Sequence, residues 1–296
     1  MSEDRNIRRK LGFTEEDFEF LIGVKQKNSD QLSLWEAGGS SLSAAKLDLI
    51  SRLPDKIPFK NINKSTFKFI DLFAGVGGIR MPFQELDGEC VFSSEWDKFA
   101  QKTYAVNYGE FPKGDITKIS AKAIPKHDIL LAGFPCQAFS NAGLKKGFDD
   151  TRGTLFFEIQ RIIAHHKPKA FLLENVKQFK GHDNGKTLET LLSVLSGNKS
   201  KEIPKNIKLS KETRKALETQ LNYSITYKVL SSKDFGVPQN RQRIYIVGFD
   251  KDQIDINDDE VERFFENVIA KNYPNPSLRK ALFSNSEVEK KYTISD

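Results

Sequence analysis

The stretch FKFIDLFAGVGG, residues 67–78, decides the fold, because an apolar run is followed at once by glycines. The apolar run predicts a buried strand, and Gly75, Gly77 and Gly78 let the backbone approach a ligand at the carboxyl end of a sheet. A dinucleotide fingerprint needs the spacing G-x-G-x-x-G. Counted from Gly75, its third glycine falls on Arg80. The turn therefore disfavours NAD and remains compatible with another nucleoside cofactor.

Short strands and helices alternate after this turn. The predicted strands are 67–75, 89–96, 128–135, 170–176, 224–232 and 243–250, and the predicted helices are 79–88, 97–108 and 155–166. The alternation predicts an α/β fold with a doubly wound sheet. About ten residues join the last two strands, too few for a crossover helix, so we expect those strands to be antiparallel neighbours. Gly88 is expected to end the first helix.

Residues 1–65 predict a helical N-terminal extension that carries no recognisable chemistry. A helix is expected at 14–24, where Thr14 provides a capping pattern, and another at 40–53. The stretch 28–39 between them is expected to be a loop.

The composition is that of an ordinary globular chain, with 38% hydrophobic and 29% charged residues. Two cysteines, Cys90 and Cys136, exclude a disulfide scaffold and favour a reducing compartment. Together with the four histidines, they form no pattern typical of zinc ligands, and we predict no metal. No apolar run approaches the ~20 residues of a membrane helix, and no apolar signal core opens the chain.

Positive charge is concentrated in residues 177–249, which carry 14 basic and 6 acidic side chains. Residues 250–296 carry 7 basic and 11 acidic side chains, and the whole chain has a formal charge of +6. The basic segment favours a polyanionic partner, although a solvated lysine-rich loop explains the same charge equally well.

Two carboxylates follow the glycine turn at the ends of successive units. Glu95 ends the second predicted strand, where an acid can accept hydrogen bonds from both ribose hydroxyls. Asp115 follows the second predicted helix and could read an adenine amino group. Each feature alone is common in α/β proteins, but their order favours an adenosine-type cofactor.

Three further positions at the strand ends carry reactive or charged groups. Cys136 is a nucleophile if its thiolate is stabilised and otherwise an inert buried thiol. Burial of Glu174 would raise its pKa enough for proton donation, whereas exposure would make it an ordinary strand end. Arg241 and Arg243 alternate onto one side, which suits a phosphate, a base edge or a surface ion-pair cluster.

The chain carries six short motifs in order: FAGVGG, SSEWD, GDI, GFPCQ, LLENVK and QNRQR. The series resembles that of the DNA (cytosine-5)-methyltransferases, in the form found in prokaryotic restriction–modification systems. The resemblance covers about residues 67–250; each motif alone is weakly specific, whereas the ordered set is strongly specific.

The resemblance implies S-adenosylmethionine as the cofactor, on a Rossmann-like sheet. Phe73 would pack on the adenine, Trp96 would flank it, and Leu155 would close the pocket. Glu95 would hold the ribose hydroxyls and Asp115 the adenine amino group. The implied cofactor-binding set is Phe73, Gly75, Gly77, Gly78, Glu95, Trp96, Asp115, Ile116, Pro135 and Leu155.

The resemblance also implies methyl transfer to C5 of a cytosine that is flipped out of duplex DNA. The Cys136 thiolate would attack C6, and Glu174 would hydrogen-bond or protonate N3. Arg243 would bind the base carbonyl, and Arg241 would support that side of the pocket. The implied DNA-binding residues, in the polar loop after the cysteine, are Gln137 and Ser140.

Members of this family normally continue into a target-recognition domain and a last cofactor motif, and we find neither before Asp296. We therefore expect a catalytic domain at 66–250, a linker at 251–296, and the catalytic part of a split or truncated enzyme. A second polypeptide would then be a partner besides double-stranded DNA, in the bacterial cytoplasm at the nucleoid. The alternatives are a cofactor- or DNA-binding module without turnover, and a tRNA cytosine-5 methyltransferase.

Overall fold

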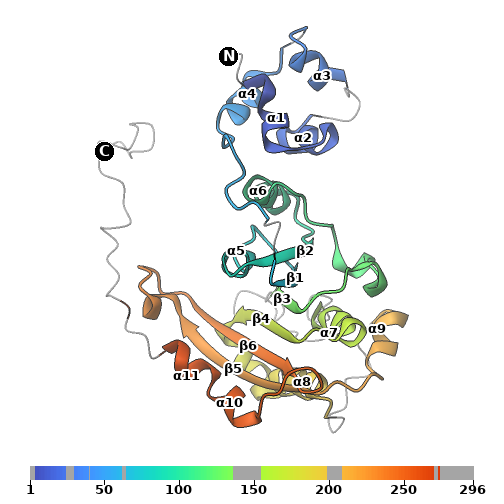
Figure 1. Cartoon of the computed structure of the whole chain (residues 1–296), viewed down its shortest axis with the longest axis vertical. Helices are drawn as coiled ribbons and strands as arrows, with labels where there is room; N and C mark the ends of the chain where they lie inside the picture. Colours follow the sequence, from blue (N-terminus) through green and yellow to red (C-terminus); the bar gives the residue numbers. More distant parts are fainter. Residues whose placement is uncertain are drawn as a thin grey trace.

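The computed structural model describes residues 4–24, 30–39, 41–61, 65–135, 155–198, 209–269 and 273. A six-stranded sheet with the order β2-β1-β3-β4-β6-β5 runs through the molecule (Figure 1). Its strands are β1 Phe67–Leu72, β2 Gly88–Ser94, β3 Ile129–Gly133, β4 Ala170–Val176, β5 Tyr223–Ser231 and β6 Gln242–Asp250. The first four strands pair in parallel, and β6 is antiparallel to both β4 and β5. The predicted α/β class and the antiparallel last pair are confirmed.

The strand order indicates where on the sheet a ligand is expected to bind. Strand β1 pairs with β2 on one side and with β3 on the other, so the order reverses between β1 and β3. In open α/β sheets, ligands bind outside the carboxyl ends of the strands at such a reversal. Because β6 runs the opposite way, its amino end joins this edge, and Val176 at the end of β4 is paired with Arg243.

Helices and 3₁₀ segments connect and cover the strands (Figure 1). The α-helices from the sheet onward are α5 Arg80–Glu85, α6 Lys98–Tyr108, α7 Leu155–His166, α8 Lys186–Ser196, α9 Lys211–Ala216, α10 Asp258–Glu262 and α11 Phe264–Ile269. The 3₁₀ segments there are η3 Ile116–Lys118, η4 Ala121–Ala123, η6 Lys177–Gly185 and η7 Ser232–Phe235. The N-terminal elements are η1 Asp4–Asn6, α1 Ile7–Leu11, α2 Glu15–Ile22, α3 Asp30–Glu36 and α4 Ala44–Ser51.

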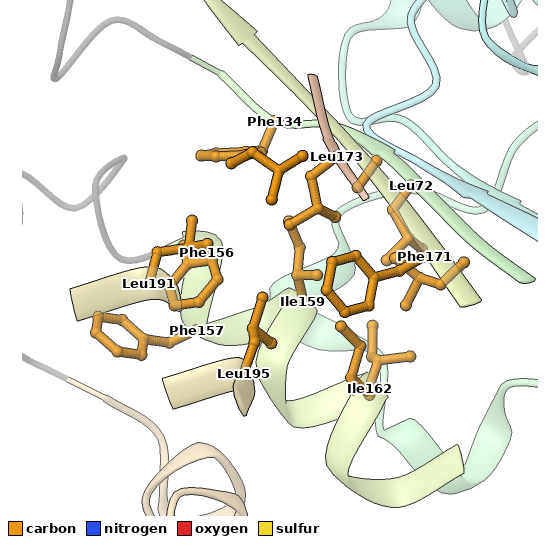
Figure 2. Close-up of a cluster of buried hydrophobic side chains, with 14 of the residues drawn as sticks. Leu72, Phe134, Phe156, Phe157, Ile159, Ile162, Phe171, Leu173, Leu191 and Leu195 are labelled. Atoms are coloured by element: carbon orange, nitrogen blue, oxygen red, sulfur yellow. The ribbon is translucent and has the colours of Figure 1, made fainter. Parts of the chain in front are cut away.

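The main hydrophobic core lies between the sheet and helices α7 and α8. Figure 2 shows Phe156, Ile159 and Ile162 of α7 facing Phe171 and other strand side chains. These α7 residues recur at helical spacing and are at most 1% exposed. Burial of each such side chain contributes about 1.5–3 kcal/mol to the free energy of folding. The apolar pattern therefore fixed α7 and β4 at their predicted bounds.

The N-terminal helices form a second hydrophobic cluster, which also includes Ala105 of α6. Helix α2 begins as predicted, because the Thr14 side chain accepts the Asp17 amide. The loop expected at 28–39 is wrong: helix α3 occupies much of it. Leu32 and Trp35 of α3 are one helical turn apart and at most 4% exposed, and their burial against the other helices outweighs the polar local sequence.

The boundary between α5 and β2 also differs from the expectation. Gly88 does not end the helix but begins β2, and α5 ends at Glu85. The chain reverses through Asp87, whose φ is 63°. A Cβ on Gly88 would lie 2.6 Å from the Phe67 ring, so close strand packing explains this glycine.

Helices α10 and α11 follow the sheet directly and pack beside β5 (Figure 1). Val261 of α10 is 1% exposed, and the rings of Phe264 and Phe249 lie 5.7 Å apart between centroids. Among the residues that the model describes, no helix combines the length and the apolar character needed to cross a membrane.

Candidate cofactor and catalytic site

The turn after β1 has a backbone that only glycine accommodates at one position. Phe73, Gly75 and Gly77 have φ values of 54°, 55° and 90°. A Cβ on Gly77 would lie 2.1 Å from a ring carbon of Tyr108 in α6, and the Tyr108 hydroxyl donates to the Gly77 carbonyl at 2.5 Å. The turn is thus pressed against α6, and the predicted glycines form an open backbone edge.

Glu95 follows β2 and is bonded directly to this turn. One of its carboxylate oxygens accepts the Gly75 amide at 2.8 Å, and the other accepts the Asp97 amide at 2.8 Å. The side chain is fixed by two backbone donors, while a carboxylate has about four acceptor positions. Free acceptor positions therefore remain for hydroxyl groups such as those of a ribose.

Large exposed apolar side chains lie within a few residues of the contact between Gly75 and Glu95. Trp96 is 73% exposed, Val76 50% and Phe99 80%. Flat aromatic surfaces of this kind suit stacking on a heterocyclic ring. The sequence interpretation included Trp96 but missed Phe99, whose signal is an apolar side chain in the first turn of α6, outside the buried face of the helix.

Asp115 lies at the same edge, because the segment before it extends the sheet past β2. Lys113 accepts the Glu95 amide at 2.9 Å and forms an isolated parallel bridge with Ser94. The Asp115 carboxylate caps η3, accepting the Thr117 amide at 3.0 Å and the Thr117 hydroxyl at 2.8 Å.

The remaining predicted cofactor residues differ in exposure. Ile116 is 3% exposed and belongs to the main core, so in this structure its side chain faces inward. Pro135 and Leu155 are half-buried, at the two borders of the segment that the model leaves undescribed, and Gly78 is exposed. Together, a side-chain-free turn, Glu95 with spare acceptor positions, Asp115 and exposed aromatic rings fit an adenosine-containing cofactor.

Arg80 occupies the position where a dinucleotide fingerprint has its third glycine. Its guanidinium is fully buried behind the turn, donates to the Tyr104 hydroxyl at 2.7 Å and to Gln84 at 2.8 Å, and forms an ion pair with Glu110. It also lies 4.2 Å from the ring centroid of Tyr108. The arginine therefore joins α5 to α6 beneath the turn, a role that the sequence interpretation missed.

A further buried carboxyl group, Asp71, precedes the turn on β1. It is 1% exposed, and neither of its oxygens has a hydrogen-bond partner among the described residues. Burial raises its pKa to about 7, although the nearby Arg80 charge lowers it.

Glu174 and Arg243 meet where β4 ends and β6 begins. The Glu174 Oε1 atom lies 2.8 Å from Arg243 Nε, and the two side chains are 18% and 20% exposed. Burial raises the pKa of Glu174, while the charges of Arg243 and Arg241 oppose that shift. Arg241 is exposed, and its charge lowers the pKa of Glu174.

Glu174 also lies beside the strand that leads to the predicted cysteine. Gly133 at the end of β3 is its register partner, and a Cβ on Gly133 would lie 3.7 Å from Glu174 Oε2. Asn175, 1% exposed, donates to the Phe134 carbonyl at 3.3 Å and so ties the end of β3 to β4. Sequence reasoning quoted Asn175 within a motif but gave it no role.

Cys136, Gln137 and Ser140 lie outside the described residues. Phe134, the buried residue two positions before the cysteine, packs edge-on against Phe179 with ring centroids 5.6 Å apart (Figure 2 shows Phe134 above α7). Within the described ranges, no group of three or more His, Cys, Asp or Glu side chains is placed to hold a metal ion.

Comparison with known proteins identifies the family. A family model described as C-5 cytosine-specific DNA methylase matches residues 67–198 and 204–296. The chain is 44% identical over 293 residues to the Type II methyltransferase M.SsoII of Shigella sonnei, covering 98% of this chain and 68% of that protein. It is 43% identical to M.HhaI of Haemophilus parahaemolyticus, covering 79% and 62%, and 55% identical to M.HaeII of Haemophilus aegyptius, covering 62% and 50%. The chain thus spans between half and about two thirds of the length of these relatives.

Solved structures agree with the fold. The Entamoeba histolytica methyltransferase EhMeth has a TM-score of 0.53 and 20% identity, covering 77% of this chain and 62% of that chain. A Spodoptera frugiperda DNMT2 mutant has a TM-score of 0.51 and 21% identity, covering 76% and 62%. The chain belongs to the C-5 cytosine-specific DNA methylases, enzymes that use S-adenosylmethionine as methyl donor for C5 of cytosine in DNA.

Proposed function

We propose that this chain methylates C5 of a flipped-out cytosine in duplex DNA through a covalent adduct with Cys136. The observation that carries the proposal is the pair Glu174–Arg243, 2.8 Å apart at the edge where β3 leads to the cysteine. A proton donor beside a guanidinium suits the N3 and carbonyl edge of cytosine.

The chemistry of these residues follows from the weak nucleophilicity of cytosine C5. The Cys136 thiolate adds to C6, and the ring then carries electron density at C5. Glu174, whose pKa is raised by burial, shares a proton with N3 as this charge develops. Arg243 donates to the base carbonyl, and Arg241 adds positive charge on the same side. Once C5 carries the methyl group, loss of the C5 proton and expulsion of the thiolate restore the aromatic ring.

S-adenosylmethionine, when bound, supplies an electrophilic methyl group. Glu95 accepts the ribose hydroxyls, Asp115 accepts the adenine amino group, and Phe73 and Trp96 contact the adenine ring. The residues proposed to complete the cofactor site are Gly75, Gly77, Gly78, Ile116, Pro135 and Leu155. Gln137 and Ser140 are proposed to contact the flipped nucleotide.

We further propose that residues 1–65 form a helical extension, 66–250 the catalytic domain and 251–296 a linker. Target recognition would come from protein outside this stretch, on the same or a second polypeptide. The length of the relatives supports this, since M.SsoII extends well beyond the part that the chain matches. A DNA substrate would place the protein at the nucleoid of a bacterial cell.

Trapping on a duplex that contains 5-fluorocytosine tests the function, with a candidate recognition subunit present and absent. We expect a covalent complex that requires the cofactor and is lost in Cys136→Ala. Cys90→Ala is the matched control, because Cys90 is a buried thiol in the core beside Phe69, and it should retain trapping.

Cofactor binding without an adduct on any duplex would favour a binding module. Label transfer from tritiated cofactor to tRNA but not to DNA would favour the RNA-modifying alternative.

A further inference from the structure

A buried ion-pair network joins three segments on the core side of the cofactor edge. Arg161 of α7 is 2% exposed; its Nε donates to Glu158 at 2.9 Å, and its Nη1 lies 3.2 Å from Glu212 of α9. Buried guanidinium groups need several partners, because an unpaired charge in the interior is costly. In this network the remaining partners come from the chain just after Asp115.

Arg161 and Glu212 together bind the backbone of residues 116–121. Arg161 Nη2 donates to the carbonyls of Ile116 at 3.2 Å and Ile119 at 2.9 Å. Glu212 accepts the Ala121 amide at 3.0 Å and the Ser120 hydroxyl at 3.1 Å. Residues 116–121 belong to two short 3₁₀ turns outside the sheet. The side chains of Arg161 and Glu212 therefore provide the backbone hydrogen bonds that neighbouring strands would provide within a sheet.

Helix α9 is itself fixed to α7, so Glu212 is a firm partner. Thr213, which is fully buried, donates to Glu158 at 2.9 Å, and Gln160 of α7 donates to the Ala216 carbonyl at 2.9 Å. The two helices lie side by side in Figure 1. Although burial raises the pKa of Glu212, its bonds to Ala121 and Arg161 outweigh that effect and lower it, so the carboxylate is charged at neutral pH.

The Asp115 carboxylate, in contrast, bonds only within its own turn among the described residues. It accepts from Thr117, and Lys118 Nζ lies 3.9 Å away. Its position therefore depends on the placement of η3. A displacement of about 1 Å is enough to weaken a directed interaction substantially.

We infer that Arg161 and Glu212 are positioning residues for the adenine end of the cofactor site, acting through Asp115. This inference rests on the proposed function, in which Asp115 accepts the adenine amino group. It adds a residue from the basic segment, Glu212, to the determinants of cofactor affinity.

Calorimetric titration of the full chain with S-adenosylhomocysteine tests this inference with Glu212→Gln. The Glu212 side chain is 43% exposed and glutamine has the same shape, so the variant should fold. We expect the Kd to rise about 3- to 10-fold, the effect of about 1 kcal/mol. In methyl transfer, the KM for the cofactor should rise while kcat at saturation changes little. Arg161→Lys keeps the charge but not the forked donors, and should weaken binding in the same direction.

A double-mutant cycle separates positioning from general stability. In an Asp115→Ala background, Glu212→Gln should cause no further loss of affinity, because the residue through which it acts is gone. Glu36→Gln is the control: it breaks the Arg8–Glu36 pair, with hydrogen bonds of 2.6 and 2.8 Å, in the N-terminal helices and should leave the Kd unchanged.

Wild-type affinity in Glu212→Gln, or an equal loss in both backgrounds, would overturn the inference while leaving the proposed function intact. An unchanged Kd in Asp115→Ala would remove the adenine role of Asp115 and the inference with it. Failure of the wild-type chain to bind S-adenosylhomocysteine would instead reject the proposed cofactor site.

Discussion

Two glutamates at the same edge of the sheet are held in opposite ways. Glu95 accepts two backbone amides, from Gly75 and Asp97, and is fixed by loops that are close in sequence. Glu174 pairs with the side chain of Arg243, which lies on the neighbouring antiparallel strand but far away in the sequence. Two backbone donors fix the orientation of the Glu95 carboxylate, whereas burial raises the pKa of Glu174 against the opposing charge of Arg243. The same side chain is thus proposed to serve binding in one region and chemistry in the other.

The largest expected effect tests the role in chemistry that is proposed for Glu174. Glu174→Gln should lower kcat for methyl transfer by about 10²- to 10⁴-fold, because the proton shared with N3 is lost. The Kd for S-adenosylhomocysteine should stay within a factor of about two of the wild-type value. A difference of that size in calorimetry counts as no change in affinity. A parallel loss of cofactor affinity would show that the two regions are not independent.

The glycine turn provides the next effect. Gly77→Ala should reduce the free energy of unfolding by about 2–3 kcal/mol, because its φ is 90° and the new Cβ would meet the Tyr108 ring at 2.1 Å. Gly78→Ala is the matched control, since no atom lies within 4 Å of its Cβ position. Urea unfolding of both variants checks the prediction, and equal losses would contradict it.

Glu95→Gln should raise the Kd for S-adenosylhomocysteine about 10-fold while leaving kcat at saturation nearly unchanged. The Gly75 and Asp97 amides bond to different oxygens of the Glu95 carboxylate, and in glutamine one of these oxygens is replaced by an NH2 donor, so one of the two hydrogen bonds is lost. Calorimetry and steady-state kinetics together separate this pattern from that of Glu174→Gln. A large fall in kcat would erase the division of roles between the two glutamates.

Asp71, beneath the glycine turn, gives an effect on stability that depends on pH. Its pKa of about 7 in the folded protein lies above its ordinary value of 3.8. The folded state therefore binds more protons than the unfolded state between those values, and this residue's contribution to stability falls as pH rises through that window. Relative to Asp71→Asn, the wild type should lose up to about 1.4 kcal/mol per pH unit there. Urea unfolding at several pH values measures this, and identical pH profiles would contradict it.

Much of the fold was predictable because the relevant patterns are local. The apolar spacing in α7 and β4 gave their bounds, and the short connection between β5 and β6 gave their antiparallel pairing. Helix α3 was not predictable in the same way, because Leu32 and Trp35 become a buried face only when the other N-terminal helices are present.

Contacts in the candidate site were predictable between motifs of successive strand–helix units. They were not predictable where the partner lies far away in the sequence. Glu95 and the glycine turn lie 20 residues apart in successive units, so their contact follows from the topology. Asn175 and Arg161, by contrast, act on backbone carbonyls more than 40 residues away. No spacing rule links such pairs, and only the packed structure brings them together.

The direction of β6 has a consequence for how freely the connections between the strands could be changed. If β6 ran parallel to β4, Arg243 would stand opposite Ala170 at the other end of β4, four residues and roughly 13 Å along the strand from Glu174. The pair depends on the direction of one strand and not on the path that connects it to β4. A circular permutant opened between α8 and α9 would therefore preserve the pair, provided that β6 still enters the sheet from the same end.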